Sequence, residues 1–272
     1  MRIAALLVFH SLKRVRTLLL ITGLLLGAFQ LVLIFVAGGI QDSGGFDQLA
    51  TLLPAFFREL LGPALASFMS FSGIVSVGYF HLTVIGALLA VAVTLATIPT
   101  AEVESGFSDF ILSRPVARHW IITRTIVVTA LGCAFIVALM VVGTRGGLNA
   151  FGRRDVQWPS AKLVTSLAVN LYMLAMCWGG VAMGIASAAR RRSIAGGAAG
   201  LLALGFYLLD YVGRLWQPAE KVAWLSPFRY YNPFELMMGN PLPAKNLIVL
   251  GAVAVAGFVA AYVLYARRDI SH

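Results

Sequence analysis

Residues 17–38, TLLLITGLLLGAFQLVLIFVAG, form an uncharged apolar run that is long enough to cross a membrane. A helix needs about 20 mostly apolar residues to span the hydrocarbon core of a bilayer. The rest of the 272-residue chain has the same character, with 60% hydrophobic residues, 12% charged residues and a mean hydropathy of +0.87. A soluble domain of this length could not hide so much apolar surface, so the composition predicts a polytopic membrane protein.

Six apolar runs predict an all-α integral membrane fold with six transmembrane helices in one domain, residues 1–272. The runs cover residues 17–38, 80–99, 120–143, 163–188, 194–212 and 246–266. The basic cluster Lys13, Arg14 and Arg16 follows an apolar stretch instead of preceding it, which is not the pattern of a cleaved secretory signal. We therefore expect residues 1–16 to form an interfacial helix on the membrane, followed by a retained first span.

The segments before the second and the sixth span are not plain loops. Residues 46–61 carry apolar residues at helical spacing, which predicts an amphipathic helix on the outer surface. Residues 63–79 are uncharged and partly rich in Ser and Gly, a composition compatible with an interfacial piece, a re-entrant loop or an extra span. The outer loop 213–245 is dense in aromatic residues, which suit a membrane interface, and in prolines, which limit it to short helices.

The distribution of Lys and Arg predicts the orientation of the chain, because cytoplasmic segments carry an excess of both residues. With the N-terminus inside, more than half of the 21 basic residues fall on the inner side: Arg2, Lys13, Arg14, Arg16, Arg114, Arg118, Arg124, Arg190, Arg191, Arg192, Arg267 and Arg268. Both termini are thus expected in the cytoplasm of a bacterial-type cytoplasmic (inner) membrane. The net charge of +10 fits topology signals and anionic lipid headgroups better than a surface for nucleic acid.

A short polar segment, TAEVESGFSDFILSRPVAR at residues 100–118, separates the second apolar run from the third. Thr100 or Ser105 is suited to cap a short helix with acidic residues in its first turn, and Pro115 ends it because proline cannot continue the helical hydrogen bonds. Such a helix, with charged flanks and an apolar side, suits a groove on a partner protein. A solvated loop with interfacial anchors explains the same composition.

The sequence contains no recognisable constellation for catalysis, cofactor binding or metal binding. Its carboxylates are spread over different loops, and no Ser/His/Asp arrangement or metal-ligand spacing occurs. The P-loop pattern G-x-x-x-x-G-K-[ST] is absent, so the chain is not expected to be an ATPase. Cys133 and Cys177 each lie inside an apolar run, where a cysteine is most simply a small packing residue.

The pattern E-x-E-S-G-F-x-x-x-I-L-S-R-P-V-x-R in the polar segment resembles the cytoplasmic segment between spans two and three of ABC transporter permeases of the type-2 exporter family. Phe107 stands where the family usually has Thr, and Ala117 where it usually has Ser. Four further segments resemble family positions in the same order along the chain: 54–62, 79–81, 226–233 and 267–269. The resemblance therefore extends over nearly the whole chain.

The resemblance implies that a separate ATPase subunit, present in two copies, binds ATP and Mg and drives this chain. Residues 101–113 would then be the coupling helix that contacts the ATPase. The ATPase-coupling residues implied in this way are Glu102, Glu104, Gly106, Phe107, Leu112, Ser113, Arg114, Pro115 and Arg118. The expected partners are this ATPase, a second permease copy or a sister permease, and the lipid bilayer.

The resulting hypothesis is an ATP-driven exporter permease whose substrate the sequence does not identify. A non-transporting membrane scaffold for a multiprotein complex is the alternative. A secondary transporter is a further rival, but it would normally leave acidic or paired polar groups near the midplane together with internal repeats, and the sequence shows neither. Two Gly-x-x-x-Gly motifs, at 180–184 and 196–200, permit close helix approach within the chain or at a dimer seam. Near the end of the fifth span, Asp210 has Arg214 as its natural partner at i+4.

Overall fold

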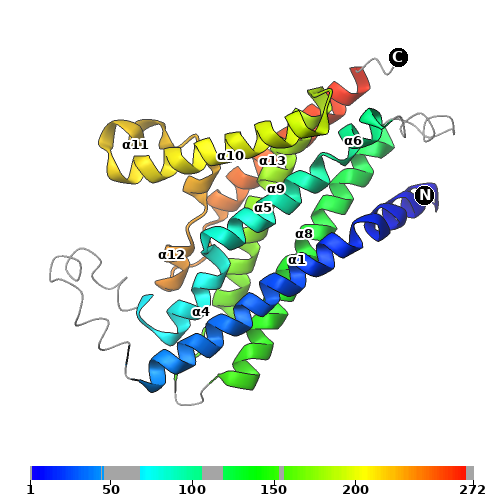
Figure 1. Ribbon diagram of the computed structural model, residues 1–272. Coiled ribbons are helices and arrows are strands. Elements are labelled where there is room, and N and C mark those ends of the chain that lie inside the picture. The colour runs from blue at the N-terminus through cyan, green and yellow to red at the C-terminus, as the bar shows by residue number, and fades with distance from the viewer. Residues whose placement is uncertain (1, 44, 46–67, 106–118, 153–155, 268–272) are drawn as a thin grey trace.

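The computed structural model describes the chain except for residues 1, 44, 46–67, 106–118, 153–155 and 268–272 (Figure 1). The described residues form helices and no strand, as the sequence predicts. Long helices lie side by side in one bundle, and short helices occupy its two ends. The elements are α1 (Arg2–Asp42), α4 (Phe71–Phe80), α5 (Leu82–Ala96), α6 (Ile98–Glu104), α8 (His119–Phe151), α9 (Ala161–Ala188), α10 (Arg192–Leu215), α11 (Gln217–Ala223), η1 (Pro227–Tyr230), α12 (Pro233–Met237) and α13 (Ala244–Arg267).

Six of these helical units are long and apolar enough to cross a membrane: Leu7–Asp42, Phe71–Ala96, His119–Phe151, Ala161–Ala188, Arg192–Leu215 and Ala244–Arg267. They correspond to the six predicted spans. The predicted N-terminal helix is also present, and it continues into the first span without a break, so that α1 is 41 residues long. The first residues of α1, the last residues of α13 and helix α6 lie at the same end of the bundle, here termed the α6 end (Figure 1).

The second span differs from the predicted range 80–99 because it begins at Phe71 and is interrupted at His81. Ser70 caps α4 by accepting a hydrogen bond from the Gly73 N–H, and the His81 N–H closes α4 on the Val77 carbonyl. The Nδ1 atom of His81 then accepts the Thr83 N–H at the start of α5. Residues 71–79 are thus the first turns of this span. The predicted amphipathic helix at 46–61 lies outside the described residues.

Close contacts at glycine fix two pairs of spans. On α8, a Cβ atom at Gly143 would lie 2.5 Å from the carbonyl oxygen of Gly27 on α1. On α9, a Cβ atom at Gly180 would lie 2.8 Å from the Ala254 Cα of α13, and one at Gly257 would meet the Gly180 backbone. Small residues at these crossings let the two backbones touch, which is how helices associate in membranes. Helix α9 lies at the centre and packs against α5, α8, α10 and α13.

Residues 213–245 include the end of α10, then α11, η1 and α12, and they form the opposite end of the bundle, here termed the α11 end (Figure 1). Proline occupies the first turn of α11, η1 and α12, where its missing N–H costs no helical hydrogen bond. Helix α10, which leads into this region, is only sparsely enclosed, since its buried residues are only Ala195, Ala199, Asp210 and Gly213. One long face of α10 is therefore open.

Candidate functional site

Helix α6 carries a buried ion pair. One carboxylate oxygen of Glu102, Oε2, accepts a 2.6 Å hydrogen bond from Nη2 of Arg124 on α8, and both side chains are only 5% exposed. On the other side, Nη1 of Arg14 in α1 lies 3.9 Å from Glu102 Oε1, with the Arg14 side chain 64% exposed. Removing one member of a buried ion pair costs on the order of 3–5 kcal/mol because the other charge stays buried. Arg14, being exposed, contributes little.

Helix α6 also bonds to the adjoining ends of α9 and α10. The Thr100 hydroxyl donates a 2.7 Å hydrogen bond to the carbonyl of Ala186, in the last turn of α9. The Glu104 carboxylate accepts a 2.9 Å hydrogen bond from the backbone N–H of Arg192, the first residue of α10. The first N–H groups of a helix lack intrahelical partners, and a carboxylate is favourable at a helix N-terminus. The short helix is therefore joined to four spans, α1, α8, α9 and α10, besides α5, which it follows.

The Arg192 side chain extends this cluster to the end of α5. Its Nε atom donates a 3.3 Å hydrogen bond to the Thr97 hydroxyl, and its Nη2 atom donates a 3.2 Å bond to the Thr94 carbonyl. Arg192 thus holds the start of α10 against the end of the second span. We call the group Thr100, Glu102, Glu104, Arg124 and Arg192 the α6 cluster.

The predicted coupling residues fall into two groups. Glu102 and Glu104 lie in α6, which begins at Ile98, three residues before the predicted helix 101–113. The structure brings these two carboxylates to Arg124 and Arg192, and Glu102 is turned into the bundle instead of onto a free surface. The other predicted residues lie outside the described part of the chain: Gly106, Phe107, Leu112, Ser113, Arg114, Pro115 and Arg118.

A groove runs between α5 and α10. Its middle is an apolar hollow of about 490 Å³ whose walls come from α5, from the open glycine-containing face of α10 and from Phe228 of η1. The lining residues are Leu82, Ile85, Gly86, Leu89, Ala90, Val93, Thr94, Gly196, Gly200, Ala203, Leu204, Tyr207 and Phe228. Ligand-binding clefts are commonly lined by apolar and aromatic side chains in this way.

Two further hollows prolong the groove and share lining residues with its middle. Toward the α6 end, a hollow of about 470 Å³ is bounded by Glu104 and Arg192 of the α6 cluster and by the neighbouring Thr97. Toward the α11 end, a hollow of about 340 Å³ is lined mainly by aromatic residues together with Asp210 and Arg214. The groove is thus apolar in the middle and bears an acid and an arginine at each end.

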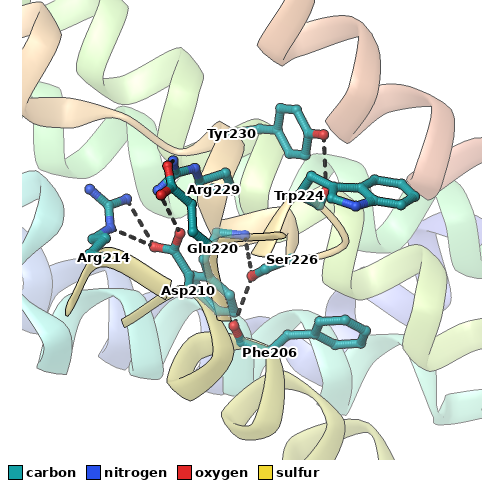
Figure 2. A network of polar contacts seen from close by, with 9 residues as sticks. Phe206, Asp210, Arg214, Glu220, Trp224, Ser226, Arg229 and Tyr230 are labelled. Carbon is teal, nitrogen blue, oxygen red and sulfur yellow. Dashed lines mark hydrogen bonds and ion pairs between the residues drawn. The ribbon is translucent and has the colours of Figure 1, made fainter. Parts of the chain in front are cut away.

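A network of polar contacts holds α11 and η1 against α10 at the far end of this groove (Figure 2). Arg214 donates a 2.9 Å hydrogen bond through Nε to Asp210 Oδ2, which confirms the predicted i+4 pair. Arg229 of η1 lies 3.9 Å from Asp210 Oδ1 and 3.7 Å from Glu220 of α11. The Ser226 hydroxyl donates to the Phe206 carbonyl of α10 at 2.8 Å. Together these contacts shape one wall of the groove.

Tyr231 ties the same region to the break in the second span. Its hydroxyl donates a 2.8 Å hydrogen bond to the carbonyl of Tyr79, near the end of α4. That carbonyl has lost its helical partner, because the Thr83 N–H is bonded to His81. Burial raises the pKa of the Tyr231 hydroxyl well above its usual value, so the hydroxyl stays protonated and remains a donor.

These features define a class: the chain is a multi-pass helical membrane protein with an apolar groove along two of its spans. Residues 12–266 match the family described as "Multidrug efflux system permease Rv1217c, C-terminal domain". The chain belongs to this family, which confirms the resemblance to ABC-type permeases noted in its sequence. A comparison with curated proteins found no match.

Proposed function

We propose that the chain is the membrane subunit of an ATP-driven exporter, moved by a separate ATPase that is present in two copies and binds ATP and Mg. The family supports a role in efflux, since its description names an efflux permease. The sequence has no P-loop, so the energy of hydrolysis would have to come from another subunit. A second copy of this chain, or a sister permease, would complete the transporter.

The α6 cluster is the observation that carries this proposal. Helix α6 leads directly into the segment that resembles a coupling helix, and its side chains reach α8, α9, α10 and α1. A push on residues 101–113 would therefore act on several spans together. Buried ion pairs and packed helices shift between discrete arrangements more readily than they deform continuously, which suits alternation between inward-open and outward-open states.

The groove between α5 and α10 supports the proposed transport path. Its apolar middle would face a second permease copy, and an apolar or amphipathic molecule would move between the two halves. The open glycines Gly196 and Gly200 would let the partner helix approach closely. The α11 end, with its aromatic hollow, would then form the exit.

The orientation we propose puts the α6 end in the cytoplasm and the chain in a bacterial-type cytoplasmic membrane. The α6 end carries Lys13, Arg14, Arg16 and Arg190–Arg192, and cytoplasmic loops are enriched in such residues. This orientation gives the ATPase access to residues 101–113. It also places both chain ends inside.

The binding step is tested by co-purification with an ATPase of the same host. The wild-type chain should retain the ATPase, and the double variant Arg114→Glu, Arg118→Glu should release it because both predicted contacts reverse charge. The double variant Arg190→Glu, Arg191→Glu is the matched control, since it makes the same charge change at two exposed positions of the α6 end outside this segment. Retention of the ATPase by the double variant, or equal loss in the control, contradicts the docking site. Absence of any ATPase partner favours a scaffold.

The coupling step is tested separately with Glu102→Gln. This variant should still bind the ATPase but lose most substrate-stimulated ATP hydrolysis, because Arg124 no longer holds α6 to α8. Arg14→Gln should retain both properties, since Arg14 is exposed and 3.9 Å from the carboxylate. Full stimulation in Glu102→Gln would show that α6 does not transmit the movement.

A further inference from the structure

A second hollow lies between α1 and α8 and shares no lining residue with the α5–α10 groove. These helices touch at Gly27 and Gly143, and a Cβ atom at Gly23 would also collide with Leu139. Toward the α6 end they separate and leave a hollow of about 610 Å³. Its lining residues are Leu12, Arg16, Leu19, Leu20, Leu131, Ala134, Phe135 and Ala138.

The walls of this hollow are apolar apart from Arg16. Three of its large side chains are substantially exposed, with Leu20 at 46%, Leu131 at 49% and Phe135 at 40%. Both helices are membrane spans, so the medium that meets these side chains at this depth is hydrocarbon. The stretch from Leu131 to Ala138 rises about 10 Å along α8, enough for part of one acyl chain.

The end of the hollow toward the α6 end is positively charged. Arg16 lies there, and Lys13 is three residues earlier on α1, so the two exposed side chains are neighbours on the helix surface. Within the described part of the chain, neither has an acidic partner, whereas Arg14 approaches Glu102. Two uncompensated cations where the apolar run begins complement a negatively charged headgroup. Their long side chains can reach the headgroup level while their stems stay on apolar surface.

We propose that the α1–α8 hollow binds an anionic phospholipid, with one acyl chain against Leu20, Ala134 and Phe135 and the headgroup phosphate at Lys13 and Arg16. A zwitterionic lipid brings its own cation to the same level and gains less from these two residues. The site depends only on α1 and α8 spanning the membrane. It is therefore independent of the ATPase and of the α5–α10 groove.

The test uses the full-length protein in nanodiscs of phosphatidylcholine with increasing phosphatidylglycerol, and native mass spectrometry counts the phosphatidylglycerol retained after release. Lys13→Gln and Arg16→Gln should each weaken retention about fivefold, the equivalent of about 1 kcal/mol per charge. Arg16→Lys keeps the charge and should retain most of the binding. Ala134→Trp fills the hollow without touching the charges and should also displace the lipid.

Arg145→Gln is the matched control, because Arg145 is an exposed arginine on α8 far from the hollow. Thermal unfolding in phosphatidylcholine alone checks that every variant is folded. Retention that is unchanged in Arg16→Gln and Ala134→Trp would overturn the proposal. Equal loss in Arg145→Gln, or equal retention of phosphatidylcholine by the wild type, would overturn it as well, since the binding would then be neither local nor selective for charge.

Discussion

Helices α9 and α10 each carry a Gly-x-x-x-Gly motif, and the structure uses the two motifs differently. Gly180 and Gly184 of α9 face α13, where a Cβ atom at Gly180 would lie 2.8 Å from the Ala254 Cα. Gly196 and Gly200 of α10 have no heavy atom within 4 Å of an added Cβ, and both line the α5–α10 groove. The first motif is filled within the chain, and the second is free for another molecule.

This difference shows that the motif specifies a surface that permits close approach and does not specify what approaches it. In membranes, helix association relies on packing and close backbone contact, because lipid is as apolar as the helices. A filled motif therefore stabilises the fold, whereas an open one offers the same packing energy to a second chain. The contrast supports the proposal that a second permease copy packs against the α10 face.

The largest effect is expected at the filled motif. Gly180→Leu forces a side chain into the backbone of α13 and should destabilise the fold by about 3 kcal/mol, with loss of a monodisperse peak in size-exclusion chromatography. Gly197→Leu on α10 is the matched control, since its added Cβ meets nothing within 4 Å and the variant should stay folded. Equal destabilisation by both variants would remove the distinction between the two helices.

An intermediate effect is expected at the open motif. Gly200→Leu should leave thermal unfolding of the single chain unchanged but weaken dimerisation in lipid vesicles about tenfold, or about 1.4 kcal/mol, as measured by energy transfer between labelled chains. Gly146→Leu, on an open face of α8, should leave dimerisation as it is. Unchanged dimerisation in Gly200→Leu would exclude this face as the seam.

The smallest effect is expected at the wall of the groove. Tyr231→Phe removes the hydrogen bond to the Tyr79 carbonyl and should lower stability by about 1 kcal/mol, with faster amide hydrogen exchange around His81. Tyr230→Phe is the control, because the Tyr230 hydroxyl bonds to the Trp224 carbonyl at an exposed position and its loss should cost less. If the two variants behave alike, the Tyr231 bond does not hold the break in the second span.

The six spans could be predicted from the sequence because few structures other than a transmembrane helix contain an apolar run long enough to cross a bilayer. The start of the second span could not, since residues 71–79 are uncharged but rich in Ser and Gly and read equally well as an interfacial or re-entrant piece. The break at His81 depends on a side chain that accepts the Thr83 N–H. Such a local exchange of hydrogen-bond partners leaves no periodic pattern in the sequence.

The candidate site was only partly predictable for a similar reason. The i+4 pair of Asp210 and Arg214 follows from helical spacing, and the structure contains it. Glu102 and Arg124 are 22 residues apart, and Glu104 binds a backbone N–H 88 residues away, so neither contact has a sequence pattern. Glu102 was predicted as an ATPase-coupling residue, and that role stays a prediction, with the carboxylate paired to Arg124 inside this chain.

The bond between Glu104 and the backbone N–H of Arg192 bears on how the two positions tolerate mutation. Every amino acid except proline supplies that N–H, so in a saturation library proline at 192 should be depleted more strongly than side-chain changes there. Those changes would lose only the longer bonds to Thr94 and Thr97. At 104, by contrast, shortening the side chain to Asp already withdraws the carboxylate from α10. The side chain at position 104 therefore determines this contact, whereas position 192 contributes only its backbone N–H.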